Sequence, residues 1–308
     1  MSRTLIVGTG SIGRRHGEIL AELGCEVAVV SRRDVDHAFT SFSNITTAIE
    51  RFDPGYVVLA RETSAHLPDL EVLRSSGFRG KVLVEKPLAD HPVSVPDADF
   101  ERIAVGYNLR FHPVLAAIRE ELANTGPAVT VMVYAGQHLS SWRPGTEYQS
   151  GYSADPGRGG GVLRDLSHEL DYLQWLFGPW RSVCGIGGRS GAIDVRSDDH
   201  WSVLLCSTAC PTIGLQVNYL DRIGQRTITI ITPKTTIHAD LVANRVRVND
   251  RTDTIVVERN DTYRRQHIAM LQGHDADLLC SLAEGGATLE LIDAIERSAR
   301  TTSWIEAV

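Results

Sequence analysis

Short apolar segments alternate with amphipathic segments over the first third of the chain. The apolar segments cover residues 4–7, 26–30, 56–59 and 82–84. Segments with helical spacing of their apolar positions cover residues 12–23, 44–52 and 64–76. Short continuous apolar runs are typical of strands buried on both faces, and strands that alternate with helices form βαβ units. The pattern therefore predicts a doubly wound parallel sheet with helices on both faces.

The pattern changes after about residue 106. Helical spacing now covers residues 113–123, 161–177, 264–283 and 287–300. Strand-like segments cover residues 128–135, 182–187, 200–206, 212–219, 226–232, 235–238, 244–248 and 254–258. Consecutive strands without intervening helices are typical of an antiparallel sheet. We therefore expect an α/β domain over residues 1–106 and an α+β domain with a large, mostly antiparallel sheet over residues 107–308.

Composition argues against several classes of partner. The chain has 308 residues, is 43% hydrophobic and carries a net charge of −7, which argues against nucleic acid. No apolar run is long enough to span a bilayer, and Met1 leads directly into a strand without a signal segment. The five cysteines include no C-x-x-C pair, so neither a disulfide framework nor a zinc site is indicated. The sequence predicts a cytoplasmic protein without a metal, nucleic-acid or membrane partner.

A glycine-rich loop joins the first predicted strand to the first predicted helix. It consists of Gly8, Thr9, Gly10, Ser11, Ile12 and Gly13, which fit G-x-G-x-x-G. Between a strand and a helix, this spacing is typical of dinucleotide binding by a Rossmann-type domain. Gly8 permits a tight turn, Gly10 lets the backbone approach a pyrophosphate, and Gly13 allows the helix to pack closely on the strand. Residues 1–106 are therefore predicted to bind NAD or NADP at the helix N-terminus.

The residue that reads the adenosine ribose is expected about 20 residues after this loop. Ser31 holds that position at the end of the second predicted strand and is followed by Arg32 and Arg33. A carboxylate would accept hydrogen bonds from a ribose 2′-hydroxyl, whereas a hydroxyl and two guanidinium groups suit a 2′-phosphate. The arginines are also compatible with a solvated surface. We expect NADP to be preferred over NAD.

Four further motifs, in order along the chain, carry a family resemblance. They are residues 60–66, the triplet Glu85, Lys86 and Pro87, residues 107–113 and residues 159–171. Together with the glycine loop, they resemble the glucose–fructose oxidoreductase, inositol 2-dehydrogenase and rhizopine-catabolism (Gfo/Idh/MocA) family over nearly the whole chain. The resemblance implies that Lys86, Asp165 and His168 line the nicotinamide pocket. The cofactor contacts expected with it are Ala60, Glu62, Thr63, His66, Glu85, Lys86 and Asn108.

Two features depart from the common family pattern. Asp165 and His168 are three residues apart, whereas many members space these residues four apart. The segment between Pro87 and Gly106 is short and contains further prolines. Together with residues 142–148, these features resemble a compact branch of the family that is associated with sugars and nucleotide sugars. This link to a class of substrates is an analogy.

The residues implied by the resemblance suit the oxidation of a hydroxyl group. In such a reaction the nicotinamide carries the hydride, while the protein orients the substrate and handles a proton. His168 suits the base because an imidazole titrates near neutral pH. Lys86 follows a predicted strand, where its ammonium could stabilise alkoxide character, although an ion pair with Glu85 is the simpler interpretation without the resemblance. Asp165 could orient the substrate or the imidazole.

Aromatic and cationic side chains predict a sugar-binding surface near the loop at 136–161. The candidates are Arg110, Trp142, Arg143, Tyr148 and Tyr152, together with Asp165 and His168. Aromatic faces pack on sugar C–H surfaces and tyrosine hydroxyls bond sugar hydroxyls, although packing within the loop explains these residues equally well. Tyr152 is an alternative to His168 as the acid or base.

The helix predicted at 161–177 is expected to carry two faces. Its buried stripe consists of Val162, Leu166, Leu170 and Leu173. The second face holds Asp165, His168 and Tyr172, because residues three apart on a helix are neighbours. A metal site at Asp165, His168 and Asp171 is not favoured, since no H-E-x-x-H spacing occurs. Glu169 falls outside the predicted set, and its removal is expected to be mild.

The sequence thus favours an NAD(P)-dependent oxidoreductase that transfers a hydride between a nicotinamide and a carbinol or ketone of a sugar, cyclitol or nucleotide-linked sugar. The alternative is a non-catalytic NADP-binding sensor or scaffold protein on the same fold, which would not need Lys86, Asp165 and His168. Because the second domain has many strands and few helices, one sheet face is expected to lack cover. We expect that face to form a homodimer or a homotetramer.

Overall fold

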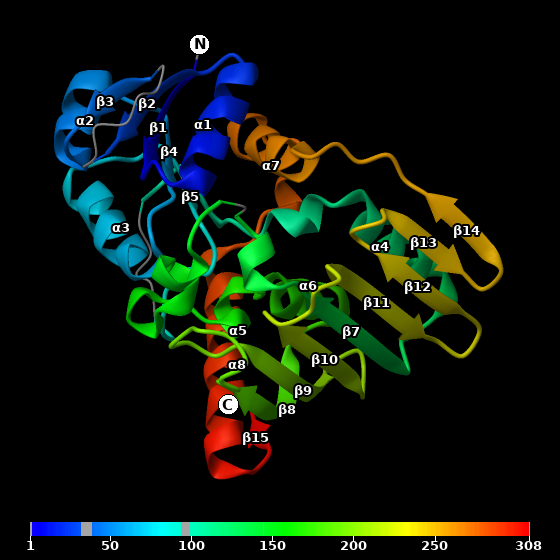
Figure 1. The fold of residues 1–308 in the computed structure, drawn as a ribbon. Helices are drawn as coiled ribbons and strands as arrows, with labels where there is room; N and C mark the ends of the chain where they lie inside the picture. The colour runs from blue at the N-terminus through cyan, green and yellow to red at the C-terminus, as the bar shows by residue number, and fades with distance from the viewer. Residues whose placement is uncertain (1, 32–38, 94–98, 144, 308) are drawn as a thin grey trace. The chain divides into compact units, whose positions relative to one another are not determined.

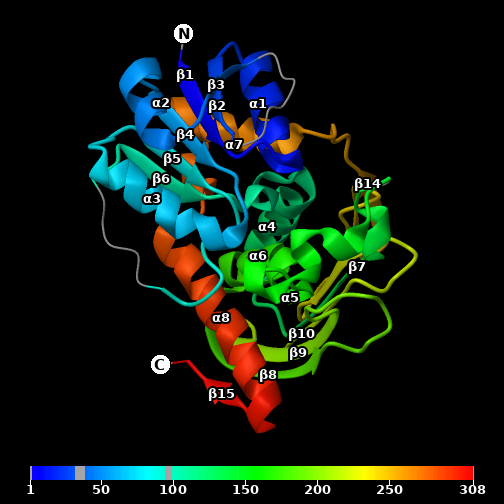
Figure 2. The ribbon, with the colours of Figure 1, turned by 60° about the vertical axis from the view of Figure 1, so that its left-hand side comes forward.

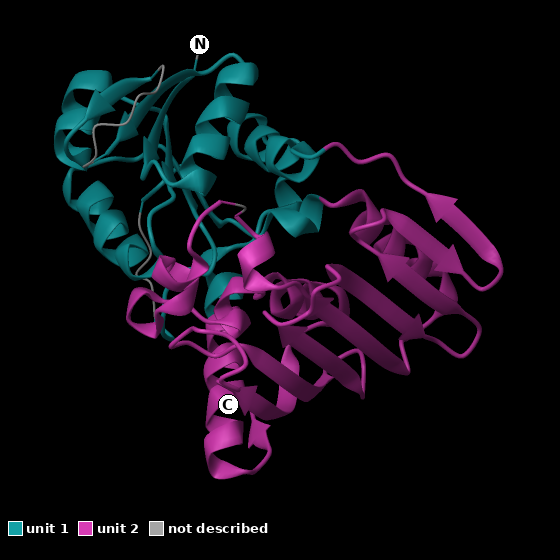
Figure 3. Cartoon of the chain, viewed as in Figure 1, with its two compact units in different colours: residues 1–111, 259–286 teal, residues 112–258, 287–308 magenta. Residues whose placement is uncertain are grey.

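A computed structural model describes residues 2–31, 39–93, 99–143 and 145–307. The chain forms two compact units, each made of two segments (Figure 3). Unit 1 comprises residues 1–111 and 259–286, and unit 2 comprises residues 112–258 and 287–308. The sequence pattern places all of residues 107–308 in one domain and carries no signal that 259–286 joins unit 1. No helix within the described ranges is both long enough and apolar enough to cross a membrane.

Unit 1 contains a six-stranded parallel sheet with the strand order β3-β2-β1-β4-β5-β6. Its strands are β1 (Arg3–Val7), β2 (Glu26–Val30), β3 (Thr40–Phe42), β4 (Tyr56–Leu59), β5 (Lys81–Val84) and β6 (Arg102–Val105). Its helices include α1 (Ser11–Glu22), α2 (Ile45–Phe52), α3 (His66–Ser75) and α7 (Asp261–Gln272), with 3-10 turns at Thr63–Ala65, Asn108–Phe111 and Ala276–Leu278. α1 and α7 lie on one face of the sheet, and α2 and α3 lie on the other (Figure 1, Figure 2). The predicted Rossmann-type sheet is confirmed.

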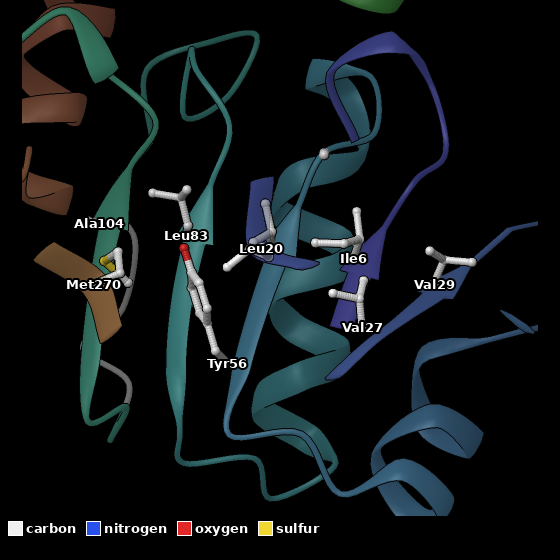
Figure 4. Close-up of a cluster of buried hydrophobic side chains, with 10 residues drawn as sticks. Ile6, Leu20, Val27, Val29, Tyr56, Leu83, Ala104 and Met270 are labelled. Atoms are coloured by element: carbon white, nitrogen blue, oxygen red, sulfur yellow. The ribbon is translucent and has the colours of Figure 1, made fainter. Parts of the chain in front are cut away.

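Apolar side chains from distant parts of the sequence meet in the core of unit 1. Figure 4 labels Ile6, Leu20, Val27, Val29, Tyr56, Leu83, Ala104 and Met270 in this cluster. Met270 belongs to α7 and is fully buried. Burying such a side chain contributes about 1.5–3 kcal/mol, so this contact helps to hold α7 on unit 1.

Unit 2 contains a nine-stranded sheet with the order β14-β13-β12-β11-β7-β10-β9-β8-β15. Its strands are β7 (Thr130–Gly136), β8 (Trp180–Gly188), β9 (His200–Ser207), β10 (Ile213–Asn218), β11 (Gln225–Ile231), β12 (Thr236–Asp240), β13 (Arg245–Val248), β14 (Arg251–Thr254) and β15 (Ile305–Glu306). Its helices include α4 (Pro113–Thr125), α5 (Val162–Asp165) and α6 (His168–Phe177), and α8 (Leu282–Thr301) spans residues of both units. Neighbouring strands are antiparallel except for the parallel pair β7–β10. The mostly antiparallel sheet predicted for the second half is confirmed.

One face of the sheet in unit 2 exposes apolar side chains. Gly214 lies opposite both Met132 and Leu204 in the strand register, so these two side chains share a face. Each of them is 52% exposed, and Ile186 on the same face is 74% exposed. The alternate positions, such as Val133 and Leu205, are buried. The sheet therefore has one buried face and one face that presents apolar groups.

Turn geometry changes the ends of two predicted elements. Gly273, at φ 83°, ends α7 at Gln272, so the helix predicted to continue to residue 283 stops earlier. A two-residue turn after Val248 fixes β14 at Arg251–Thr254, and the strand predicted at 254–258 is wrong. The strands β3, β6 and β15 escape the prediction because two to four residues are too few to show a periodicity.

Candidate functional site

The glycine loop forms a backbone cradle between β1 and α1. Gly8 has a φ of 107°, which other residues rarely adopt, and its N–H donates to the carbonyl of Val30 at 3.1 Å. A Cβ at Gly13 would lie 1.9 Å from the carbonyl oxygen of Gly8, so only glycine fits there. A Cβ at Gly10, in contrast, would meet no atom within 4 Å. The loop is thus closely packed at Gly13 and open at Gly10.

The N-terminus of α1 lies at the open part of this loop. Among the residues that the structure describes, no side chain caps this end of the helix, and its first turn holds no acidic residue. Uncapped N–H groups and the positive end of the helix dipole favour an anion. These features fit the pyrophosphate of a dinucleotide, to which Thr9, Gly10, Ser11 and Ile12 would present their backbone.

Ser31 follows β2 and contacts the loop through its side chain. The hydroxyl oxygens of Thr9 and Ser31 are 2.9 Å apart. The N–H of Ser31 donates to the carbonyl of Phe42 at 3.2 Å, which ties this position to β3. Arg32 and Arg33, on which the expected NADP preference also depends, lie outside the described residues.

Other residues expected at the cofactor hold loops in place. Ala60 and Thr63 are buried after β4, whereas Glu62 is exposed. The ring nitrogens of His66 lie 3.0 Å from the carbonyl oxygen of Pro87 and 3.2 Å from that of Arg61. Burial lowers the pKa of His66, against smaller opposing effects of Glu85 and the carbonyls. His66 therefore links the loop after β4 to the loop after β5.

Asn108 and Arg110 are buried by contacts within unit 1. The amide of Asn108 donates to the hydroxyl of Thr262 at 2.7 Å. Arg110, expected at the substrate, is 2% exposed and donates to Glu284 at 2.8 Å. An ion pair of this kind occupies the guanidinium, so a supporting role fits Arg110 better than a direct substrate contact.

Lys86 follows β5, at the carboxyl end of the parallel sheet where ligands of such folds bind. The preceding residue, Glu85, turns its carboxylate toward the ring of His16, with Oε1 2.9 Å from Nε2. Burial alone would raise the pKa of Glu85, but the hydrogen bond and charge of His16 and the charges of Lys86 and His66 lower it overall. Glu85 is therefore an anion beneath the loop that carries Lys86.

The segment that carries Asp165 and His168 is two helices. α5 ends at Asp165, and α6 begins at His168 after a break at Leu166 and Ser167. The single helix predicted at 161–177 is wrong, so helical spacing no longer supports the expectation that Asp165 lies beside His168. The predicted buried stripe is confirmed, but Tyr172 is also fully buried. Since α5 is only one turn long, other contacts must orient Asp165.

Two tyrosine hydroxyls supply those contacts. Tyr152 donates to Oδ1 of Asp165 at 2.8 Å, and Tyr219 donates to Oδ2 at 2.5 Å. The close approach of the chain explains the glycine motif, because a Cβ at Gly160 would lie 2.1 Å from the carbonyl oxygen of Tyr152. We refer to Asp165, Tyr152 and Tyr219 as the tyrosine–aspartate centre.

The tyrosine–aspartate centre weakens the case for Tyr152 as a base. Burial raises the pKa of Tyr152 well above its ordinary value, and the charge and hydrogen bond of Asp165 raise it further. A phenol with a raised pKa holds its proton at neutral pH. Tyr152 therefore acts as a hydrogen-bond donor, and His168, which is 9% exposed at the start of α6, stays the candidate base.

Two of the predicted sugar-binding side chains pack against this centre. The ring of Trp142 meets the ring of Tyr219 edge-on at 5.3 Å, and the guanidinium of Arg143 lies 5.5 Å from the ring centre of Tyr152. Tyr148 instead contacts His138, at 6.3 Å between ring centres. The aromatic surface is thus organised around Asp165, with Tyr148 beside a different partner.

Glu169 has a structural role that its position in the sequence conceals. Its carboxylate is fully buried and pairs with Nε of Arg226 at 2.7 Å. Removing one partner of a buried ion pair costs about 3–5 kcal/mol, so we expect the loss of Glu169 to lower stability. In the part of the chain that the structure describes, no group of three or more His, Cys, Asp or Glu side chains is placed to hold a metal ion.

Sequence reasoning missed Tyr219, His16 and His267. Tyr219 follows β10, 54 residues from Asp165, and His16 meets a residue 251 positions away. The only local signal at Tyr219 is a tyrosine at the end of a predicted strand. No local pattern could reveal these contacts, since they depend on how the sheets are assembled.

A model of the GFO/IDH/MocA C-terminal domain matches residues 121–238. This part of the chain is therefore similar to the Gfo/Idh/MocA family. The inositol 2-dehydrogenase/D-chiro-inositol 3-dehydrogenase of Lacticaseibacillus casei is 24% identical over 193 residues, which are 56% of this chain and 51% of that protein. The match therefore spans about half the length of that curated relative.

Solved structures share the fold over the whole chain. Levoglucosan dehydrogenase, solved in complex with NADH and L-sorbose, is 17% identical with a TM-score of 0.85, and the match covers 100% of this chain and 99% of that one. The WlbA dehydrogenase of Chromobacterium violaceum, in complex with NADH and UDP-GlcNAcA, is 20% identical with a TM-score of 0.78, covering 100% and 96%. At these identities the similarity establishes the fold of this chain and nothing beyond the fold.

Proposed function

We propose that this chain is an NAD(P)-dependent oxidoreductase that transfers a hydride between a nicotinamide and a carbinol or ketone of a sugar, cyclitol or nucleotide-linked sugar. Similarity to the Gfo/Idh/MocA family supports the reaction class. The named activities of the similar proteins support sugar-like substrates. The observation that carries the proposal is the open cradle at Gly10, where an uncapped helix end and close-packed glycines suit a dinucleotide.

The proposed reaction assigns a separate role to each of three residues. The bound nicotinamide supplies the hydride acceptor or donor. Lys86 donates a hydrogen bond to the reacting oxygen and stabilises its negative charge. His168 removes or returns the proton of the hydroxyl group. Asp165, held by two phenols, orients the substrate hydroxyl or the imidazole, because a carboxylate accepts more than two hydrogen bonds.

Cofactor preference is a separate part of the proposal. We infer NADP as the preferred cofactor because Ser31 replaces the acidic ribose reader and two arginines follow it in the sequence. The similar proteins named above were solved with NADH, so NAD is the alternative.

We also propose a homodimer or homotetramer that uses the exposed sheet face of unit 2. Met132, Ile186 and Leu204 expose apolar surface on this face, and such surface usually marks an interface. A monomer by light scattering at micromolar concentration would contradict this part of the proposal.

Activity on a substrate panel tests the proposed function. Sugars, cyclitols and nucleotide sugars are each assayed with both cofactors by following the absorbance of the reduced nicotinamide. We expect turnover with at least one class, lost in Lys86→Ala and kept in Lys234→Ala, since Lys234 is an exposed lysine of unit 2. Cofactor binding without any turnover would instead support the sensor or scaffold alternative. Activity confined to 2-oxo acids or simple aldehydes would contradict the sugar-like substrate.

A further inference from the structure

Four polar side chains form a continuous hydrogen-bonded chain in the interior of unit 1. The hydroxyl of Tyr56 lies 3.0 Å from Nδ1 of His267, and Nε2 of His267 lies 2.8 Å from Nδ1 of His16. Nε2 of His16 lies 2.9 Å from Oε1 of Glu85. Glu85 is 7% exposed, and the other three side chains are fully buried. The chain therefore connects β4 and α7 to the residue that precedes Lys86.

Protonation fixes the direction of the hydrogen bond between His16 and Glu85. An ionised carboxylate only accepts hydrogen bonds, so His16 donates from Nε2 to Glu85. The directions of the two remaining hydrogen bonds, between His16 and His267 and between His267 and Tyr56, depend on the tautomers of the two rings. Burial lowers the pKa of His267 well below its ordinary value, and the charge of His16 adds to this effect. His267 is therefore a neutral ring with one donor and one acceptor nitrogen.

The surroundings confine the carboxylate of Glu85. A Cβ at Gly106 would lie 2.9 Å from Oε1, so the backbone after β6 passes directly against this oxygen. The other oxygen, Oε2, accepts the backbone N–H of Lys86 at 3.2 Å. His66 contacts the carbonyl of Pro87 in the same loop. Glu85 therefore links the ring of His16 to the backbone that carries Lys86.

We propose that His16 and His267 are positioning residues for Lys86, acting through the carboxylate of Glu85 and its hydrogen bond to the Lys86 backbone. The proposal rests on the proposed function, which places Lys86 at the nicotinamide. Apolar side chains could fill the same buried space, as Met270 does in the adjoining core (Figure 4). A satisfied polar network instead fixes one geometry, because each donor must meet its acceptor.

The charge of Glu85 depends on the same network. The titratable groups that face it are His16 from α1, Tyr56 from β4, His66 from α3 and the adjacent Lys86. Burial favours the neutral acid, and the donor on His16 is the main opposing influence. Without that donor, the pKa of Glu85 should rise above its ordinary value. The carboxylate would then be lost as the pH falls through the raised pKa, and the support of the Lys86 loop with it.

The first test compares the pH dependence of kcat at saturating cofactor and substrate. His16→Leu should lower kcat and move its acid limb upward by about one to three pH units, the scale that burial produces. His267→Leu should give a smaller shift of the same sign, because His16 still donates to Glu85. His16→Gln should restore the acid limb, since its amide can donate to Glu85. Met270→Leu, a buried control on α7 outside the network, should leave the profile unchanged.

The affinity for the cofactor distinguishes a positioning role of His16 from a general role in supporting the glycine loop. The Kd for reduced cofactor, measured by fluorescence titration, should be the same in His16→Leu and the unmodified protein. A parallel loss of affinity and kcat, with an unchanged acid limb, would overturn the proposal. It would show instead that His16 only packs α1.

A second measurement needs no turnover. The protein is prepared with glutamate labelled at its side-chain carboxyl and studied by NMR. The carboxyl resonance that disappears in Glu85→Gln belongs to Glu85. This resonance should titrate at higher pH in His16→Leu than in the unmodified protein. An unchanged titration overturns the proposal even in an active enzyme. A raised titration in a protein that turns over none of the substrate panel supports the network and removes the proposed oxidoreductase function instead.

Discussion

Unit 1 and unit 2 build their candidate sites from different materials. In unit 1 the glycine loop offers backbone groups, with uncapped N–H groups at the start of α1 and a close approach between Gly8 and Gly13. In unit 2 Asp165 is held by the hydroxyls of Tyr152 and Tyr219, which lie 13 and 54 residues away. The glycine loop lies within one short segment of the chain, whereas the tyrosine–aspartate centre needs residues from three separate segments.

This difference implies opposite responses to substitution. A backbone cradle depends on the absence of a Cβ at its close contacts, so it is sensitive to size. A centre made of side chains depends on donors and acceptors, so it is sensitive to the loss of a single polar atom. Substitutions in the glycine loop should therefore change cofactor binding or folding according to the space at each glycine, and those in the tyrosine–aspartate centre should change stability or turnover.

The largest expected effect is on turnover, at the candidate base of unit 2. His168→Ala should reduce kcat by about 10²–10⁴-fold, the usual loss when an acid or base is removed. Lys86→Ala should be at least as damaging, because it removes charge stabilisation of the reacting oxygen. Cofactor affinity, measured by fluorescence titration, should barely change in His168→Ala, since the phosphate loop is intact.

His274→Ala is the control for His168→Ala, because His274 is an exposed histidine after α7. It should keep both turnover and affinity. Glu169→Ala is unsuitable as a control, since it breaks the buried pair with Arg226. Near-normal turnover in His168→Ala would show that the imidazole is not the base.

The second expected effect distinguishes two glycines of the same loop. Gly10→Ala should fold normally, because Gly10 has an ordinary φ of −65° and open space around it. Its methyl group should nevertheless displace the phosphate and weaken cofactor binding by about 10–100-fold, the value of one hydrogen bond to a charged group. Gly13→Ala should lower the free energy of unfolding by about 1–3 kcal/mol even without cofactor. Thermal denaturation and cofactor titration of both variants check this contrast, and equal effects on stability would contradict it.

The same contrast explains how much of the fold the sequence could predict. The parallel sheet, the glycine loop and most strands of unit 2 follow from local periodicity and turn residues. The return of residues 259–286 to unit 1 does not, because the fit of Met270 against Leu83 and Ala104 becomes visible only once the sheet exists. Likewise, a break of two residues divides α5 from α6 without a proline or glycine to announce it.

The candidate site divides in the same way. Gly8, Gly10 and Gly13 are predictable because their spacing itself describes the backbone they form. The partners of Asp165 and Glu85 are not, since Tyr219 and His16 lie 54 and 69 residues away from them in the sequence. The motif thus identifies the carboxylate in the sequence. The tertiary structure determines which side chains donate hydrogen bonds to it.

The third expected effect is on stability, at the tyrosine–aspartate centre. Tyr219→Phe and Tyr152→Phe should each lower the free energy of unfolding by about 1–3 kcal/mol, because each leaves one carboxylate oxygen of Asp165 without its donor. Tyr148→Phe, whose ring contacts His138, should change it by less than about 0.5 kcal/mol. Chemical denaturation measures all three. In a double-mutant cycle, Asp165→Asn should couple to Tyr219→Phe and not to Tyr148→Phe.

The smallest expected effect lies at Ser31, where a side chain borders the backbone cradle of unit 1. Ser31→Asp should keep the fold, because a carboxylate can accept the hydroxyl of Thr9 that Ser31 now contacts at 2.9 Å. Its charge should repel a 2′-phosphate and accept a ribose hydroxyl, which moves the ratio of NADPH to NADH affinity by about tenfold toward NADH. Ser31→Ala removes the same contact without adding charge, so it should weaken both cofactors to a similar extent. If the unmodified protein binds NADH as well as NADPH, or if Ser31→Ala moves the ratio as far as Ser31→Asp, charge at this position does not determine the preference.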